Sequence, residues 1–286
     1  MALVIPAVTR LSPRVIRVLG CNPDVKTLQG TNTYIVGTGK RRILIDTGDS
    51  DVPQYINHLR SVLKYEKIDL AHIFLTQSMP DHSGGLNDIL EHLSEYTQFC
   101  QVWKFPKYGD KNIYQYFEDL KDGQEFTVDG ATIRVIHTPG HSPDHVSFHL
   151  LEDNAVFSGD CVLGDGTAAF EDLDKYMESL QELLNIQPKV IYPGHGNVVN
   201  DPQERIRYYL NHRVERENQI VNVLSTHRVR SFSETELVSI IYTDLPEKLV
   251  KTAEFNVSNH LTKLLKEEKV KKYNNLWQYN GEKCIC

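Results

Sequence analysis

The loop Thr76-Gln-Ser-Met-Pro-Asp-His-Ser-Gly-Gly85 directly follows the apolar run His72-Ile-Phe-Leu75. Its Asp81-His82 pair offers a carboxylate and an imidazole, which are the ligands that zinc prefers when thiolates are absent. The two glycines at its end allow the backbone to approach other segments closely. An Asp-His pair is also common on ordinary loops, so the meaning of this loop depends on the rest of the chain.

Further loops carry a histidine or an aspartate within two residues of a glycine, in each case after a short apolar run. They are Leu44-Ile-Asp46-Thr-Gly48, Thr138-Pro-Gly-His141, Phe157-Ser-Gly-Asp160 and Tyr192-Pro-Gly-His195-Gly196. Any one of them, such as a lone Pro-Gly-His, is more often a simple turn than a metal ligand. Their joint occurrence in one chain is improbable by chance. The sequence therefore predicts loops that converge on a shared metal ion.

The first two hundred residues alternate between strand and helix patterns. Helical patterns cover 55–65 and 173–184. Such a mixture of strands and covering helices indicates a layered α/β or α+β domain over residues 1–200. Short runs rich in β-branched residues predict strands at 34–36, 42–45, 72–75, 132–136, 146–150, 155–157 and 189–192.

The pattern becomes helical after Asp201. Asp201-Pro202 supplies an N-cap and a first-turn proline for one helix, and Ser233-x-x-Glu236 is a capping box for a second. A short strand pair around Asn274-Asn275 is expected to follow, so residues 201–286 resemble a winged-helix module. One apolar face of a third helix is predicted from the helical spacing of Leu249, Ala253, Val257, Leu261 and Leu264.

Composition limits the contacts that this protein can make with membranes and nucleic acids, and it indicates the state of its cysteines. The chain has 286 residues and no run of eighteen apolar residues, so we expect no membrane span. The net charge of -7 repels phosphates at long range, so any contact with nucleic acid requires a local basic patch. We expect free thiols in a reducing compartment, because no zinc-type spacing relates the cysteines at 21, 100, 161, 284 and 286.

Lysines near the C-terminus leave two interpretations open. Glu267 and Glu268 are interspersed among them, which is typical of a solvated surface. The alternative is a patch that contacts RNA phosphates. The lysines concerned are Lys263, Lys266, Lys269, Lys271 and Lys272.

Taken in order, the five loops resemble the motifs of the metallo-β-lactamase superfamily. The segments Leu19-Gly-Cys-Asn-Pro and Phe157-Ser-Gly-Asp-Cys-Val-Leu-Gly164, with the helical tail, resemble its β-lactamase-like protein 2 family over nearly the whole chain. The resemblance implies an α+β fold, an αββα sandwich with the metal site at one edge and a winged-helix-like C-terminal part. It also implies an endoribonuclease that cleaves single-stranded RNA through a zinc-bound hydroxide in the mitochondrial matrix, with no DNA substrate.

One motif departs from the family. The family loop reads His-x-His-x-Asp-His, and the two first places hold Gln77 and Met79 here. The first metal site then retains only His141 and Asp160, and a methionine thioether is a soft ligand that is poorly matched to zinc.

The second metal site retains every ligand that the resemblance implies. Its four ligands are Asp81, His82, Asp160 and His195. We therefore expect one zinc ion in the second site, and we expect Asp81 to act in catalysis as well as in metal binding.

Neighbouring residues suggest supporting roles. Asp46 is expected to orient His82 or a loop amide, and either His137 or His145 supports the ligands or simply ends a strand. Asn32 is expected to make turn hydrogen bonds or to line the substrate.

Several alternatives stay open at this point. A thioester or lactone hydrolase uses the same chemistry, and a non-catalytic descendant that binds RNA or a partner also fits the loss of two histidines. Arg10, Arg14 and Arg17 suit a transit segment for import into an organelle. Residues 15–19 also have the pattern of a strand, and if they are only a strand, the cytoplasm is the alternative location. The sequence does not indicate an oligomeric state.

Overall fold

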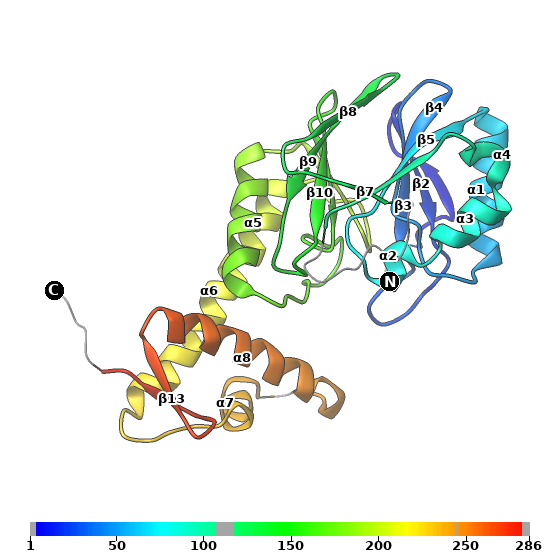
Figure 1. Cartoon of the computed structure of the whole chain (residues 1–286). Coiled ribbons are helices and arrows are strands. Elements are labelled where there is room, and N and C mark those ends of the chain that lie inside the picture. The colour runs from blue at the N-terminus through cyan, green and yellow to red at the C-terminus, as the bar shows by residue number, and fades with distance from the viewer. Residues whose placement is uncertain (1–3, 107–116, 244, 282–286) are drawn as a thin grey trace.

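The computed structural model describes residues 4–106, 117–243 and 245–281. Two β-sheets face each other, helices cover their outer faces, and a helical part follows at the C-terminus (Figure 1). This arrangement is the αββα sandwich that the family resemblance implies. Within the described residues, no helix is both long enough and apolar enough to cross a membrane. Cys21, Cys100 and Cys161 are free thiols, whereas Cys284 and Cys286 lie outside the described residues.

The first sheet has seven strands in the order β1-β2-β3-β4-β5-β6-β7. Its first pairings are antiparallel and those from β4 to β7 are parallel. The strand at 15–19 is confirmed as β2. The strands are β1 (Val8–Arg10), β2 (Val15–Leu19), β3 (Asn32–Val36), β4 (Arg41–Ile45), β5 (Asp69–Phe74), β6 (Gln101–Lys104) and β7 (Phe117–Asp119), and the helices on this side are α1 (Pro53–Glu66), α2 (Pro80–Ser83), α3 (Leu86–His92) and α4 (Ser94–Thr97).

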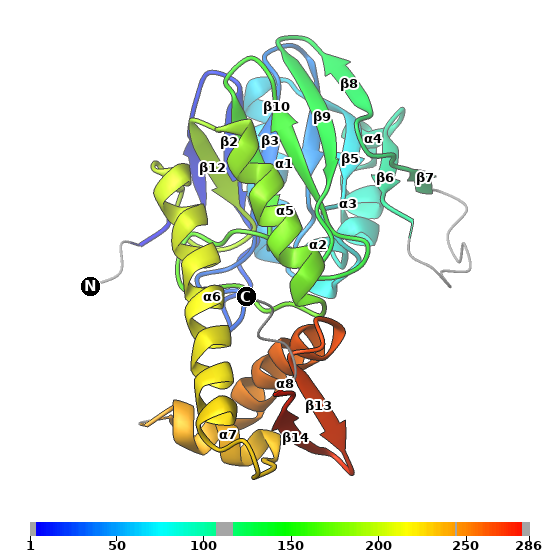
Figure 2. The same ribbon diagram turned by 90° about the vertical axis from the view of Figure 1, so that its left-hand side faces the viewer.

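The second sheet has five strands in the order β12-β11-β10-β9-β8. Strands β11 and β12 are parallel, and α5 makes the crossover between them. Figure 2 shows α5 lying across the outer face of this sheet. The elements are β8 (Glu125–Val128), β9 (Ala131–His137), β10 (Val146–Leu150), β11 (Ala155–Gly159), α5 (Leu173–Ile186) and β12 (Val190–Pro193).

The core follows from the alternation of side chains along each strand. In β5, Phe74 points between the sheets, where its ring centroid lies 5.1 Å from that of Phe148 in β10. The preceding Ile73 faces the other way and packs beneath α1 against Leu59. Because successive side chains alternate, one strand contributes to both apolar layers.

The C-terminal part begins with a long helix that is shared between two cores. Helix α6 (Pro202–Thr226) buries Ile206 and Tyr209 against α5, and it buries Ile220 and Leu224 among the C-terminal helices. Figure 2 shows α6 running from the second sheet to α7 and the hairpin. The predicted division at 200/201 lies just before this helix, so α6 ties the two parts together.

The predicted capping signals are confirmed. Asp201 caps α6, and Ser233 and Glu236 form the capping box of α7 (Glu234–Ile241). Asn274 and Asn275, both at positive φ, form the turn of the hairpin. The remaining elements are the 3-10 helix η1 (Glu247–Leu249), α8 (Val250–Lys266), β13 (Val270–Tyr273) and β14 (Leu276–Tyr279).

The prediction of the apolar face of the third helix is wrong for one residue, Leu249. Leu249 lies in η1, before α8 begins, and its side chain is 40% exposed. A 3-10 helix has three residues per turn, so its side chains do not keep the spacing of the α-helix that follows. Leu249 therefore does not continue the buried face of α8. The other four residues of that face are buried as expected, namely Ala253, Val257, Leu261 and Leu264.

Three of the five C-terminal lysines form ion pairs within the chain. Lys263 lies 2.9 Å from Glu217 of α6, Lys266 lies 2.9 Å from Asp174 of α5, and Lys269 lies 2.8 Å from Glu267. Lys263 and Lys266 therefore join helices, and Lys269 pairs locally, so these three lysines do not form a free basic patch. Lys271 and Lys272, in contrast, make no ion pair among the described residues and lie over the rings of Tyr273 and Trp277.

The ion pair of Glu217 predicts that acid destabilises the C-terminal helices. Burial works to raise the pKa of Glu217, but the nearby His260 and Lys263 outweigh it and lower this pKa from 4.5 to about 2. Ionised Glu217 therefore stabilises the fold above the unfolded-state pKa, and this contribution is lost as the pH falls towards the folded-state value. We expect wild type to lose more denaturant stability than Glu217→Gln between about pH 6 and about pH 3. Equal losses would contradict the assignment.

Candidate metal centre

Five loops meet at one edge of the two sheets, each following the C-terminal end of a strand. Asp46 follows β4, α2 follows β5, and His141 follows β9. On the second sheet, Asp160 follows β11 directly and His195 comes two residues after β12. Carboxyl ends of parallel strands point to the same edge, which explains why loops that are distant in sequence converge here.

Four side chains form a cluster with the spacing of a metal site. Asp81, His82, Asp160 and His195 each offer one ligand atom, and these atoms all lie within 4.8 Å of one another. His82 Nε2 lies 3.2 Å from Asp160 Oδ2, and His195 Nε2 lies 3.2 Å from Asp81 Oδ2. The structure thus brings together the four residues that the sequence assigns to the second site.

Unsatisfied polar atoms show that this cluster fits a cation. Asp160 Oδ1 is buried without a hydrogen-bond partner in the protein. A buried carboxylate oxygen without a partner is costly, and a cation at the centre of the cluster would satisfy it. Two imidazoles and two carboxylates form a donor set that suits a divalent ion such as zinc.

The charges in the cluster also favour a cation. Burial works to raise the pKa of Asp160, but His82 and His195 hold it well below its usual range. The pKa of Asp81 is likewise lowered, because hydrogen bonding to His195 and the charge of His82 outweigh its burial. Both carboxylates are therefore ionised at neutral pH and present negative charge to the centre of the cluster.

Asp46 orients the imidazole of His82, as the sequence predicts. Its Oδ2 lies 2.8 Å from His82 Nδ1, and its Oδ1 accepts a hydrogen bond from the Thr76 amide. A carboxylate accepts only, so His82 Nδ1 carries the proton and Nε2 faces the cluster. Asp46 adopts a φ of 60° to do this, an unusual conformation for a residue other than glycine.

Of the two histidines whose role was open, His145 supports the site. Its Nε2 accepts a hydrogen bond from the Asp160 amide at 3.0 Å, which requires an unprotonated nitrogen. Burial, reinforced by the charge of His141, lowers the pKa of His145 to about 3 and keeps it neutral. His137 instead stacks on Phe105 at a centroid distance of 4.0 Å.

Asn32 holds the loop that carries His195. Its Nδ2 donates to the carbonyl oxygens of Pro193 and Gly196, at 3.0 and 2.9 Å. Asn32 begins β3 and is fully buried, so it neither caps a turn of its own segment nor is exposed to a substrate; its amide instead holds a distant loop.

The fold and the cluster agree with comparisons to known proteins. The model of the metallo-β-lactamase superfamily matches residues 27–195, more than half of the chain. The chain belongs to the metallo-β-lactamase superfamily. A second model, the β-lactamase associated winged helix domain, matches residues 233–277 and confirms the C-terminal prediction.

Curated relatives place the chain more closely within the superfamily. It is 48% identical to the β-lactamase-like protein 2 homolog of Drosophila melanogaster over 93% of both chains. It is 40% identical to the homolog of Caenorhabditis elegans, over 91% of this chain and 87% of the relative. It is also 38% identical to the lactamase-like protein aptB of Emericella nidulans, over 93% of this chain and 85% of the relative.

Solved structures share the fold at low sequence identity. A β-lactamase domain protein from Burkholderia ambifaria superposes with a TM-score of 0.82 at 18% identity, over 96% of this chain and 95% of that chain. The fold of this metallo-β-lactamase chain, with its C-terminal part, therefore extends to distant bacterial proteins. Hydrolysis is the general chemistry of the superfamily, and the four-residue cluster is the candidate metal-binding site of this chain.

The first metal site of this metallo-β-lactamase fold lacks a full donor set. Gln77 is buried and its Nε2 donates to Asp160 Oδ2 at 2.9 Å, so the nitrogen of the amide faces the shared carboxylate. His141 Nε2 lies 3.4 Å from the same oxygen but outside the four-residue cluster. Met79 offers only a thioether. These residues do not fit a second zinc ion.

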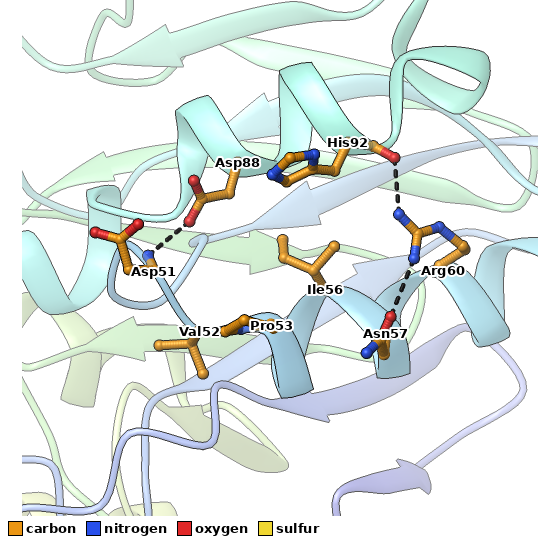
Figure 3. Close-up of a pocket in the computed structure, with 8 residues that line it drawn as sticks. All are labelled: Asp51, Val52, Pro53, Ile56, Asn57, Arg60, Asp88 and His92. Carbon is orange, nitrogen blue, oxygen red and sulfur yellow. Dashed lines mark hydrogen bonds between the residues drawn. The ribbon is translucent and has the colours of Figure 1, made fainter.

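A cavity elsewhere does not add a second site. It has a volume of about 210 Å³, lies between α1 and α3, and contains none of the four clustered residues. Figure 3 shows three hydrogen bonds among the residues that line it: Arg60 donates to Asn57 and to the His92 carbonyl oxygen, and Asp88 accepts from the Asp51 amide. These groups are satisfied within the protein, which is typical of a structural contact between two helices.

Proposed function

We propose that this protein is a metal-dependent hydrolase that binds one zinc ion and cleaves single-stranded RNA. The observation that carries the proposal is the convergence of Asp81, His82, Asp160 and His195 within 4.8 Å. A zinc ion bound by these residues would act as a Lewis acid, which lowers the pKa of water and offsets negative charge during hydrolysis. The resemblance to the β-lactamase-like protein 2 family favours RNA as the substrate.

Asp81 is the residue of the cluster that is suited to move a proton. Its side chain is 22% exposed, whereas that of Asp160 is 9% exposed and that of His195 is 3% exposed. Its carboxylate therefore borders solvent, and the oxygen that does not bind the ion can accept a proton from the attacking water. Asp160 stays enclosed by His82 and Gln77 and serves to bind the ion.

In this proposal His141 contacts the substrate rather than a second ion. Its Nδ1 is engaged by the carbonyl oxygen of Ala169, and its Nε2 has no hydrogen-bond partner. Because Nδ1 donates to that carbonyl oxygen, the unprotonated Nε2 at the edge of the cluster can accept a hydrogen bond from a hydroxyl group or water at the scissile group.

The hairpin supplies a surface that suits single-stranded RNA. Lys271 and Lys272 belong to β13, and Tyr273 beside them is 60% exposed. Cations next to an exposed aromatic ring match the phosphates and bases of a single strand. The net charge of -7 repels RNA at long range, so the attraction for RNA phosphates must come from this local surface.

One observation favours a thioester or lactone as the alternative substrate. A cavity of about 240 Å³ adjoins α2, and its lining includes Leu86, Leu90 and Phe117. An apolar cavity beside the loop of Asp81 suits an acyl chain. The same metal chemistry would hydrolyse an acyl carbon.

Metal counting and paired substrate assays test the proposal. We expect one zinc per chain by elemental analysis, and cleavage of single-stranded RNA that a chelator abolishes and zinc restores. We expect Lys271→Gln with Lys272→Gln to weaken RNA cleavage, with Lys40→Gln with Lys64→Gln as the matched control. Turnover of acyl thioesters with inert RNA would favour the alternative. No turnover of either substrate by the zinc-loaded protein would indicate a non-catalytic descendant.

A further inference from the structure

Segment 168–170 connects the metal centre to the C-terminal helices through three consecutive carbonyl oxygens. The carbonyl oxygen of Ala169 bonds to His141 Nδ1 at 2.8 Å. The carbonyl oxygens of the two neighbouring residues are bound by side chains of the C-terminal helices. Ala168 accepts from Arg213 Nη2 of α6 at 2.7 Å, and Phe170 accepts from Asn259 Nδ2 of α8 at 2.9 Å.

The bond from His141 determines which of its nitrogens faces the cluster. A carbonyl oxygen only accepts, so His141 Nδ1 carries the proton. Nε2, the nitrogen 3.4 Å from Asp160 Oδ2, is then the free ring nitrogen at the centre. The direction and tautomer of this imidazole therefore depend on the position of one peptide group, that of Ala169.

Arg213 is buried against the neighbouring Ala168 carbonyl group, and it has no carboxylate partner among the described residues. It is 5% exposed, and its guanidinium lies 4.6 Å from the centroid of the Phe170 ring. The edge of His260 from α8 meets the same ring at 6.3 Å. A buried cation is costly, and here the carbonyl oxygen of Ala168 and the face of Phe170 compensate it.

The turn of His141 is also tied to the residues that follow this segment. The carbonyl oxygen of Gly140 accepts from the amides of Glu171 and Asp172, at 2.7 and 3.0 Å. Gly140 has a φ of 125°, and a side chain there would collide with the backbone of Tyr176. The turn and segment 168–172 therefore move as one unit.

We infer that Arg213 and Asn259 are positioning residues for His141, and that the C-terminal helices are thereby part of the candidate site. They hold segment 168–170 from α6 and α8, and the Ala169 carbonyl oxygen holds the imidazole. The inference deepens the proposed function, since it concerns a group at the same metal centre. A displacement of about 1 Å at a reacting group can cost about a hundredfold in rate, so this support matters for catalysis.

The test reads the ring of His141 directly and does not require activity. Full-length, metal-free protein is labelled with 15N-histidine, and long-range 1H–15N spectra report the tautomer of each ring, with His141→Gln assigning the signal. We expect Arg213→Met and Asn259→Asp to remove the Nδ1-protonated signature of His141. The signals of His82 and His195 are expected to persist.

Arg216→Met is the matched control on the same helix. Arg216 stacks on Tyr242 at 3.9 Å within the C-terminal part and does not bond to segment 168–170. We expect this variant to leave the His141 signal unchanged. Asn259→Asp is nearly isosteric, so it serves as the test if Arg213→Met fails to fold.

An unchanged His141 signature in folded Arg213→Met or Asn259→Asp would overturn the inference. Loss of the signature equally in Arg216→Met would also overturn it, because the effect would then be one of general packing. Absence of RNA cleavage by wild type bears on the proposed function alone, since the ring signature is measured without substrate.

Discussion

Replacing Asp160 by asparagine is expected to abolish metal binding and to reduce hydrolysis by about a hundredfold or more. Asp160 is the carboxylate on which the cluster depends, since Oδ2 lies 3.2 Å from His82 Nε2 and Oδ1 lies 3.4 Å from His195 Nε2. The amide is nearly isosteric but neutral, so the ion loses a charged ligand. The measurements are zinc per chain by elemental analysis and the rate of cleavage at saturating zinc.

The matched control removes a carboxylate from the other end of the same sheet. Asp69 begins β5 and pairs with the exposed Lys40, whereas α2 follows the far end of that strand. Asp69→Asn is expected to retain one zinc and wild-type hydrolysis. Full zinc occupancy in Asp160→Asn, with folding verified by thermal unfolding, would refute the assignment of the cluster as the metal centre.

The double substitution Gln77→His with Met79→His is expected to raise zinc from one to two ions per chain. The new imidazoles would join His141 and Asp160, and Gln77 already reaches Asp160 Oδ2 at 2.9 Å. Two ions that stabilise both the attacking and the leaving oxygen should raise the rate by about tenfold or more, or about 1.4 kcal/mol. Isothermal titration with zinc and the cleavage rate are the two measurements.

Gln77→Leu with Met79→Leu is the control for this experiment. It changes the same two positions without adding a metal ligand, and we expect it to bind no second ion. If the histidine variant folds and still binds a single zinc ion, the loop of residues 77–79 is displaced from the first site. If wild type is inert and the histidine variant cleaves, the native protein is the non-catalytic descendant.

Sequence alone determined the fold class and the set of ligand loops. The run at 42–45 lies within β4, and the run at 72–75 overlaps the end of β5 up to Phe74. The capping box of Ser233 and Glu236 begins α7, because periodicity and capping are local properties. The strands β1, β6, β7 and β8 were not predicted. They have three or four residues and three of them lie at sheet edges, where polar side chains weaken the alternation.

Tertiary structure decided what each functional atom faces. The sequence placed Gln77 in the first site, but only the fold shows its amide nitrogen on Asp160, a contact across 83 residues. It likewise shows that Arg213 and Asn259, which the sequence gives no reason to select, hold the peptide that orients His141. The physical reason is that hydrogen-bond direction depends on the relative placement of segments distant along the chain, whereas periodicity and capping depend on neighbours within a few residues.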